Sequence, residues 1–322
     1  MTISIIACPN GFGHFYRLID IARHLSKSYK VNLICTKEQF KKINNSKYKK
    51  INFITILKQV IINQKNSCFL YDFYRKDLEK IEEIKFSSLI ISDNLINKIY
   101  IKKKFILLSN FFWGKVFNLK TIKFKKYQKI EDNFIKNNEI FQNKYFGLKN
   151  DKAKKTVKIN FTGKKRINLS STINYENKSI FFYNKNQNKF PSEIIKKLQN
   201  KYRIVSNYPI KKMNIGYHNK DHGLNNFSFI ISRPGLGSIT DSIRYNVPLI
   251  YYFQNEKNKE MEENIKLIRK YEIGLPVNRK SDTIDRIVKL ELSGYKRLFN
   301  NLKKFKFNGE KKILSYVSKT IK

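Results

Sequence analysis

The segment SRPGLGSITD, Ser232 to Asp241, constrains the fold more than any other stretch of this chain. It follows the apolar run FSFIISR, which predicts a buried strand, and it leads into apolar spacing typical of a helix. Gly235 and Gly237 allow a tight turn and a close backbone approach at the bend. Such a strand-loop-helix unit brings unpaired backbone N–H groups and a helix N-terminus to one point, which suits a phosphate. The alternative is an ordinary strand-to-helix turn in which the glycines only permit the backbone conformation and no anion binds.

The first residues of the predicted helix carry polar side chains. We expect Ser238 or Thr240 to cap the helix N-terminus. Asp241 is then about one turn inside the helix. A carboxylate at that position faces away from the phosphate site and can accept hydrogen bonds from vicinal hydroxyl groups.

The N-terminus repeats this organisation. An apolar strand from Ile3 to Ala7 is followed by Gly11, Gly13 and His14. A helix is predicted next, with apolar residues at Leu18, Ile21, Ala22 and Leu25. In doubly wound sheets, loops of this kind lie at the carboxyl ends of the strands, where ligands bind. Two such halves that face each other would form an interdomain cleft.

The length of 322 residues and the order of the elements indicate two α/β domains. In the first half, apolar runs predict strands at 3–7, 31–35, 52–56, 87–92 and 105–108. In the second half they predict strands at 179–183, 202–206, 227–232 and 248–253, with helices at 191–200, 238–245, 258–271 and 282–304. Residues 118–170 are polar and lysine-rich, and the boundary is expected within 155–178. The predicted domains are 1–170 and 171–309.

The motifs at the two ends carry a family resemblance. GFGHFYR near the N-terminus, together with SRPGLGSITD and NVPLI near the C-terminus, resembles GT-B glycosyltransferases. The pattern is similar to family 28, which includes the N-acetylglucosaminyltransferase of peptidoglycan synthesis, and to UDP-glycosyltransferase-like proteins. ILLSNFFW, Ile106 to Trp113, is similar to a stretch of the second group. The resemblance implies two Rossmann-like doubly wound domains facing across a cleft, with a last helix at 310–322 that crosses back onto the first domain.

The resemblance also implies a nucleotide-sugar site. Gly235, Gly237 and Ser238 would approach the diphosphate of the donor, and the glycine loop with Gly11 and Gly13 would face the same ligand. Asp241 stands where relatives commonly have a glutamate that binds the ribose, so the carboxylate is kept on a side chain shorter by one methylene.

Two stretches depart from the family pattern. Family 28 has a glutamine pair before an asparagine that addresses the donor sugar, whereas this chain has Glu260 to Asn264 there, without glutamine. Gln254, in the preceding loop, is the candidate substitute. Relatives often have a glycine-rich turn after the first strand of the second half, and this chain has Asn184 to Asn186. Asparagine tolerates left-handed backbone conformations, so such a turn can survive.

His14 is the candidate general base. Sugar transfer with inversion needs a group that removes the proton of the acceptor hydroxyl as its oxygen attacks the anomeric carbon, and imidazole suits this task near neutral pH. A helix that begins beside His14 favours the neutral, basic form. The alternative is a loop histidine that only shapes the turn. Asp93 ends the run SSLIISD and can orient His14 or an acceptor; its alternative role is capping the next turn.

Arg17 and Arg233 each follow a strand and can meet a phosphate or a carboxylate. The resemblance favours Arg233 as part of the nucleotide-sugar site. A plain salt bridge is the commoner outcome for an arginine in such a position.

The net charge of +41, from 66 Lys and Arg against 25 Asp and Glu, raises the alternative of a polyanion partner. Basic stretches at Lys102 to Lys104, Lys123 to Lys126 and Lys164 to Arg166 have aromatic residues nearby. Lysine is nevertheless spread over the whole chain with abundant asparagine and isoleucine, as an AT-rich coding sequence would produce. We therefore do not expect a nucleic-acid partner.

An anionic membrane surface reconciles the charge with a lipid-linked acceptor. Phe111, Phe112 and Trp113 could insert into such an interface. The alternative for this aromatic run is core packing or the wall of an acceptor pocket.

Other sequence features set limits on location and chemistry. No run of about 20 apolar residues is present and the chain begins with a fold strand, so we expect a cytoplasmic protein, with peripheral attachment to the inner face of the membrane as an option. Cys8, Cys35 and Cys68 are odd in number and are interpreted as thiols rather than a disulfide framework. We expect no cofactor and no bound metal.

The sequence thus predicts a glycosyltransferase that moves a sugar from a nucleotide diphosphate donor, UDP-linked, to a glycan or lipid-linked acceptor. A nucleotide-sugar hydrolase on the same fold is one alternative, because water can replace the acceptor. A non-catalytic polyanion-binding protein on a degenerate GT-B scaffold is the other.

Overall fold

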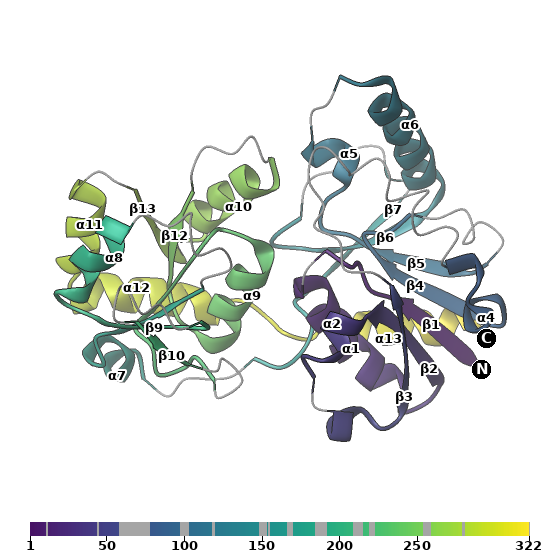
Figure 1. Ribbon diagram of the computed structural model, residues 1–322, viewed down its shortest axis with the longest axis horizontal. Helices are drawn as coiled ribbons and strands as arrows, with labels where there is room; N and C mark the ends of the chain where they lie inside the picture. Colours follow the sequence, from purple (N-terminus) through teal and green to yellow (C-terminus); the bar gives the residue numbers. More distant parts are fainter. Residues whose placement is uncertain are drawn as a thin grey trace. The chain divides into compact units, whose positions relative to one another are not determined.

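The chain folds into two compact units, Met1–Gly163 with Asn308–Lys322, and Lys164–Phe307 (Figure 1). The structure, a computed structural model, describes residues 1–10, 12–43, 45–57, 78–96, 103–117, 120–147, 153, 155–165, 170–183, 192–208, 215–218, 223–253, 259–278 and 281–321. The chain crosses from unit 1 to unit 2 after Gly163 and returns after Phe307.

Unit 1 is built on a parallel sheet of seven strands in the order β3-β2-β1-β4-β5-β6-β7. The strands are β1 (Thr2–Ile6), β2 (Lys30–Thr36), β3 (Ile51–Leu57), β4 (Leu89–Asp93), β5 (Phe105–Leu108), β6 (Glu139–Asn143) and β7 (Lys155–Ile159). The order reverses between β1 and β4, which pair directly. This is the switch point at which doubly wound sheets bind ligands.

Helices cover both faces of this sheet (Figure 1). They are α1 (Gly13–Leu25), α2 (Lys37–Phe40), α4 (Glu82–Lys85), α5 (Trp113–Val116), α6 (Ile122–Asn137) and α13 (Gly309–Ile321), with a 3-10 helix at Asn45–Tyr48. Alternate strand residues point to opposite faces, so Ile90 joins a core with α5 and α6, whereas Leu89 and Ile91 join a core with α1 and α13.

The C-terminal helix α13 belongs to unit 1. Ile313 and Val317 are fully buried in the same core as α1, and the Gly309 N–H donates to the Phe161 carbonyl at 2.9 Å. The last residues of the chain therefore complete the fold of its first half.

Unit 2 contains a parallel sheet of six strands in the order β10-β9-β8-β11-β12-β13. The strands are β8 (Ser179–Phe182), β9 (Arg203–Ser206), β10 (Gly216–Tyr217), β11 (Phe229–Ser232), β12 (Leu249–Tyr252) and β13 (Gly274–Val277). The helices are α7 (Ser171–Glu176), α8 (Ser192–Gln199), α9 (Leu236–Tyr245), α10 (Lys259–Lys270), α11 (Ser281–Val288) and α12 (Leu292–Lys303). The switch point lies between β8 and β11, which pair directly. Two Rossmann-like α/β units confirm the predicted fold class.

One predicted helix is wrong, and one region contains helices and strands that were not predicted. The single helix expected at 282–304 is two helices, α11 and α12. They separate because Glu291 is an extended N-cap residue, at φ −81° and ψ 164°, and the carbonyl of Leu290 accepts a hydrogen bond from the Tyr175 hydroxyl at 2.9 Å. The lysine-rich region from 118 onwards contains α6, β6 and β7 and remains part of unit 1 up to Gly163.

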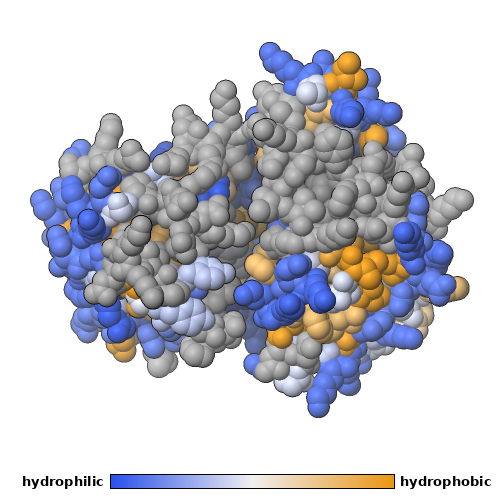
Figure 2. All heavy atoms as spheres, in the orientation of Figure 1, coloured by the Kyte–Doolittle hydropathy of each residue, from blue (hydrophilic) through white to orange (hydrophobic). Residues whose placement is uncertain are grey.

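Among the coloured residues of Figure 2, hydrophilic residues line the outer edges of both units, and unit 1 also shows a hydrophobic area. Among the described residues, none of the helices combines the length and the apolar character that crossing a membrane requires.

Candidate functional site

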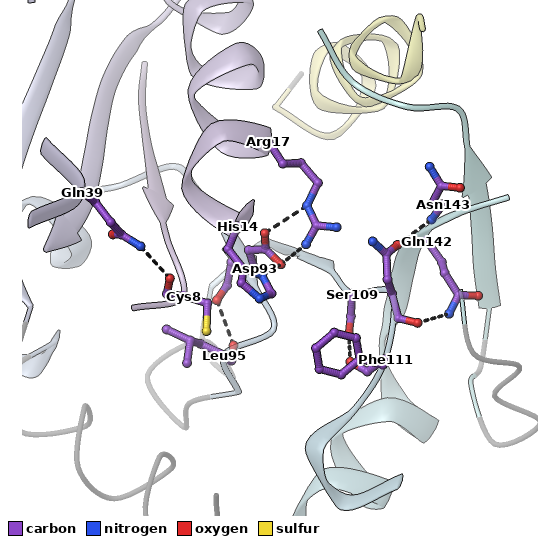
Figure 3. A network of polar contacts seen from close by, with 12 residues as sticks. Cys8, His14, Arg17, Gln39, Asp93, Leu95, Ser109, Phe111, Gln142 and Asn143 are labelled. Atoms are coloured by element: carbon purple, nitrogen blue, oxygen red, sulfur yellow. Dashed lines mark hydrogen bonds and ion pairs between the residues drawn. The ribbon is translucent and has the colours of Figure 1, made fainter. Parts of the chain in front are cut away.

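The switch point of unit 1 brings His14 and Asp93 together. His14 is the second residue of α1, just after the loop that leaves β1, and Asp93 is the last residue of β4. Because β1 and β4 are parallel neighbours, with Ile6 opposite Ser92, both side chains lie at the same edge of the sheet. Figure 3 shows the imidazole against the carboxylate.

One nitrogen of the His14 ring faces this carboxylate. Nδ1 lies 3.2 Å from Oδ1 of Asp93, close enough for an ion pair but poorly aligned for a hydrogen bond. Nδ1 is buried and has no better-aligned partner among the described residues. The ring of Phe111 approaches edge-on at 6.3 Å between centroids. With Nδ1 on the carboxylate side, Nε2 is the nitrogen left for proton exchange with a ligand.

Arg17 holds the same carboxylate from one turn further along α1. Its Nε donates to Oδ2 of Asp93 at 3.0 Å, and its Nη2 donates to Oδ1 (Figure 3). Asp93 is fully buried. Burial raises the pKa of Asp93, but the Arg17 guanidinium and His14 outweigh it, so the net pKa lies below the usual range. Arg17 therefore forms the plain salt bridge that the sequence left as an alternative, and Asp93 is an ionised acceptor.

Cys8 lies beside His14, Arg17 and Asp93, and its thiol is unreactive. Its side chain is fully buried, and burial raises the pKa of its thiol. The carbonyl of Cys8 accepts a hydrogen bond from Gln39 of α2 at 2.9 Å, which ties the end of β1 to that helix. Cys35 is also a buried free thiol, as expected, and Cys68 lies outside the described residues.

Sequence reasoning missed a row of polar residues at the ends of β5 and β6. Oδ1 of Asn110 accepts from the Asn143 N–H at 2.9 Å, and Nε2 of Gln142 donates to the Asn110 carbonyl at 3.2 Å. The Ser109 hydroxyl donates to the Phe111 carbonyl at 2.5 Å (Figure 3). The available signal was that Ser109 and Asn110 directly follow the apolar strand FILL. These contacts fix the chain that presents Phe111 to His14.

The aromatic run after β5 is buried, so insertion of these side chains into a membrane interface, one of the two options left by the sequence, is wrong. Phe111, Phe112 and Trp113 retain 5%, 4% and 4% of their exposure. Trp113 packs edge-on against Phe111 at 4.7 Å and stacks on Phe117 at 5.7 Å. The run forms core packing next to the His14 side of the sheet, as the alternative predicted.

In unit 2 the glycine loop leads from β11 into α9, as expected, but the predicted cap is wrong. The helix begins at Leu236, and its N-cap is Gly235, which has no side-chain cap. The Thr240 hydroxyl instead donates back to the Leu236 carbonyl at 2.7 Å. Gly237 and Ser238 lie in the first turn. Among the described residues, a Cβ atom added to Gly235 would meet nothing within 4 Å, so a methyl group has room at this position.

Asp241 lies in the second turn of α9, about one turn inside the helix as expected, and contacts a residue that sequence reasoning did not identify. The hydroxyl of Tyr183 donates to Oδ2 of Asp241 at 2.5 Å. Tyr183 directly follows β8, and Asp241 lies on the helix that follows β11, so this contact links the segments that leave the two strands of the switch point in unit 2. A tyrosine at a strand end belongs to no sequence motif, so the sequence did not indicate Tyr183 as a site residue.

Helix α10 contacts the glycine loop from its first turns. Nη2 of Arg233 lies 3.3 Å from the Met261 sulfur, and the buried Asn264 donates to the Pro234 carbonyl at 3.0 Å. The stretch that replaces the glutamine pair therefore supports the loop through Met261 and Asn264.

The remaining predicted site residues are Gly13, Gly11 and Gln254. Gly13 is the first residue of α1 and is exposed. Gly11, Gln254 and the turn at 184–186 lie outside the described residues. The described part of the chain contains no group of three or more His, Cys, Asp or Glu side chains placed to hold a metal ion.

Comparison with solved structures identifies the fold. UGT89C1 of Arabidopsis thaliana, solved with UDP-L-rhamnose, matches with a TM-score of 0.68 at 13% identity, over 99% of this chain and 98% of that chain. A UDP-glucosyltransferase from Polygonum tinctorium that glucosylates indoxyl matches with a TM-score of 0.68 at 11% identity, over 99% and 98%. UGT2 of Phytolacca americana, solved with UDP-2fluoro-glucose and pterostilbene, matches with a TM-score of 0.67 at 13% identity, over 99% of each chain. The chain thus has the GT-B fold of these glycosyltransferases over its full length.

No family model matches the chain. No curated protein matches it in sequence.

Proposed function

We propose that the protein is a glycosyltransferase that moves a sugar from a nucleoside diphosphate donor, UDP-linked, to a hydroxyl group of a glycan or lipid-linked acceptor. The observation that carries the proposal is the buried Asp93 carboxylate against Nδ1 of His14 at the switch point of unit 1. The GT-B fold supports the choice of reaction, because the solved structures that it resembles are glycosyltransferases.

His14 acts as the general base in this proposal. Nε2 takes the proton of the acceptor hydroxyl as its oxygen forms a bond to the anomeric carbon, and the bond from that carbon to the diphosphate breaks. The nucleoside diphosphate leaves with the electron pair, and the anomeric configuration inverts. Asp93 keeps the proton of the neutral ring on Nδ1 and stabilises the imidazolium that forms.

Unit 2 binds the donor in this proposal. Backbone N–H groups at Gly237 and Ser238 donate to the diphosphate at the N-terminus of α9. Gly235, whose own N–H donates to the Arg233 carbonyl at 2.8 Å, allows the diphosphate to approach the backbone closely, and the Arg233 side chain adds positive charge. Asp241 accepts hydrogen bonds from the ribose hydroxyls. The glycine loop at 11–13 contributes to the same ligand, and Gln254 addresses the donor sugar.

A lipid-linked acceptor would place the enzyme at an anionic membrane surface. Lys123, Lys125, Lys126 and Lys129 are exposed on α6, and each basic residue near such a surface contributes about 1 kcal/mol of attraction. This basic face now supports the membrane proposal in place of the buried aromatic run.

Thermal-shift titration with UDP, other nucleoside diphosphates and a short nucleic-acid duplex tests the donor site. We expect one nucleotide to raise the unfolding midpoint, because a ligand that binds only the native state stabilises it. Gly235→Ala and Asp241→Ala should abolish the shift. The added methyl of Gly235→Ala meets open space in the fold, so its own cost is about 1 kcal/mol for a weaker N-cap.

Gly216→Ala is the matched control, since a Cβ at this glycine of unit 2 also meets nothing within 4 Å. It should keep the full nucleotide response. Equal stabilisation by the duplex and every nucleotide, unchanged in Gly235→Ala and Asp241→Ala, would contradict the donor site and favour polyanion binding.

Turnover separates transfer from hydrolysis. We expect His14→Ala to abolish sugar transfer and to leave the nucleotide shift intact. Release of free sugar at the full rate without an acceptor would instead identify a hydrolase.

A further inference from the structure

We propose that Tyr183 is a positioning residue that holds Asp241 for recognition of the ribose hydroxyls of the nucleotide. The inference rests on the proposed donor site and extends it to a residue outside the glycine loop. Its starting observation is the hydrogen bond from the Tyr183 hydroxyl to Oδ2 of Asp241 at 2.5 Å.

The backbone of Tyr183 is fixed by the switch point of unit 2. Its N–H donates to the Ile231 carbonyl at 2.9 Å, next to the register pair of Phe182 with Ile231. Tyr183 therefore continues β8 alongside the end of β11, whose loop leads directly to α9 and Asp241. Ligands of doubly wound sheets bind outside the carboxyl ends of these two central strands.

The ring of Tyr183 is fixed by packing. It meets Phe181 edge-on at 4.9 Å between centroids, and Phe181 is fully buried. Phe181 in turn contacts Phe227 at 5.6 Å and His218 at 5.8 Å. The hydroxyl thus projects from a rigid platform, and the aspartate side chain adjusts to it.

The hydrogen bond matters because Asp241 has little reach. Aspartate is one methylene shorter than glutamate, so its carboxylate stays close to the axis of α9. A phenol that donates to one oxygen restricts rotation of the carboxylate and presents it in one orientation. An ionised carboxylate only accepts hydrogen bonds, so its ligand must supply donors, as the 2′- and 3′-hydroxyls of a ribonucleotide do. Tyr183 and Asp241 together therefore specify a ribonucleoside diphosphate.

Isothermal titration calorimetry with UDP and with 2′,3′-dideoxy-UDP tests this inference on the full chain. For Tyr183→Phe, which keeps the ring, we expect UDP affinity to fall about tenfold, the range for a hydrogen bond to a charged group. Affinity for 2′,3′-dideoxy-UDP should not change, because that ligand lacks both hydroxyls. In an Asp241→Ala background, Tyr183→Phe should not lower the UDP affinity any further.

Tyr217→Phe is the matched control, since this tyrosine is 61% exposed on β10 of the same unit. It should bind both nucleotides as the native protein does. In turnover assays, Tyr183→Phe should raise the donor KM about tenfold and change kcat less than about twofold.

Two results would overturn the inference. One is a Tyr183→Phe protein that binds UDP as tightly as the native protein; the other is an equal loss for both nucleotides, which would mean a general structural role. If Asp241→Ala weakens UDP binding in either case, the proposed function stands and only the role of Tyr183 fails. A native protein that binds no nucleoside diphosphate would overturn both.

Discussion

Arg17 donates hydrogen bonds to both carboxylate oxygens of Asp93, and one of these oxygens also faces Nδ1 of His14. Asp93 is fully buried, whereas 18% of the Arg17 side chain and 14% of the His14 side chain remain exposed. A buried carboxylate needs a cation beside it to remain ionised, and Arg17 supplies that charge.

Removing Arg17 should therefore destabilise unit 1. Arg17→Ala leaves the Asp93 charge buried without its main partner, which costs about 3 to 5 kcal/mol. Differential scanning calorimetry at pH 7 measures the loss as a lower unfolding midpoint. Arg23→Ala is the control, because Arg23 on the same helix lies 3.6 Å from Asp20 in a partly exposed pair worth less than about 1 kcal/mol. Equal midpoints for the two variants would contradict this account of Asp93.

The two groups of the proposed base should act as one unit. Asp93→Asn removes the charge that stabilises the imidazolium, so kcat should fall by about 100-fold or more. His14→Ala removes the base itself. The double variant should be no slower than His14→Ala alone, because the role of Asp93 is expressed through His14. Single-turnover rates with saturating donor measure this, and additive losses would show that Asp93 acts independently.

The fold class could be predicted because both switch points begin with a glycine loop after an apolar strand. His14 and Asp93 were named as candidate site residues for the same reason, since residues at the carboxyl ends of such strands collect at one edge of a parallel sheet. Their pairing required the structure, because it depends on β1 and β4 being neighbours although His14 and Asp93 are 79 positions apart in sequence.

The missed elements have physical explanations. Helix α6 was not predicted because its many lysines made the region look like a polar linker. Phe124, Tyr127 and Phe134 nevertheless recur at helical spacing on its buried face. Strand β13 contains Pro276, which argues against a central strand, and it is tolerated because β13 lies at the edge of the sheet. The Tyr183 contact could not be predicted, because a hydrogen bond between residues 58 positions apart depends on how the two segments are placed in the fold.

Glu131 should make stability depend on pH. Its carboxylate is buried on α6, where it accepts from the Gly114 N–H at 2.9 Å and the Tyr127 hydroxyl at 2.8 Å. Burial raises its pKa to about 7, from a usual value of 4.5, although both hydrogen bonds act to lower it. The folded state therefore holds a proton that the unfolded state releases between these values, so this contribution to stability is complete below pH 4.5 and is lost as pH rises through 7.

Glu131→Gln is neutral and nearly isosteric, so it should remove this dependence. Its stability relative to the native protein should rise by about 3 kcal/mol between pH 4.5 and 8, and unfolding midpoints across that range measure the change. Glu193→Gln, on the exposed first turn of α8, is the control and should give a constant difference. A constant difference for Glu131→Gln as well would contradict the buried, protonated carboxylate.

Gly309 should tolerate no side chain at the start of α13. A Cβ atom there would lie 2.1 Å from the Asn160 carbonyl oxygen and 3.2 Å from that of Phe161, and these backbone atoms are held by the hydrogen bond from the Gly309 N–H. Gly309→Ala should therefore destabilise unit 1 by about 1 to 3 kcal/mol, which exceeds the gain of up to about 1 kcal/mol in helix propensity. Gly294→Ala in the first turn of α12 is the control, because its Cβ would meet only the end of the flexible Leu290 side chain, at 2.8 Å. Calorimetry should show a lower midpoint for Gly309→Ala alone, and a gain in both variants would mean that helix propensity decides and that α13 is not held against Asn160.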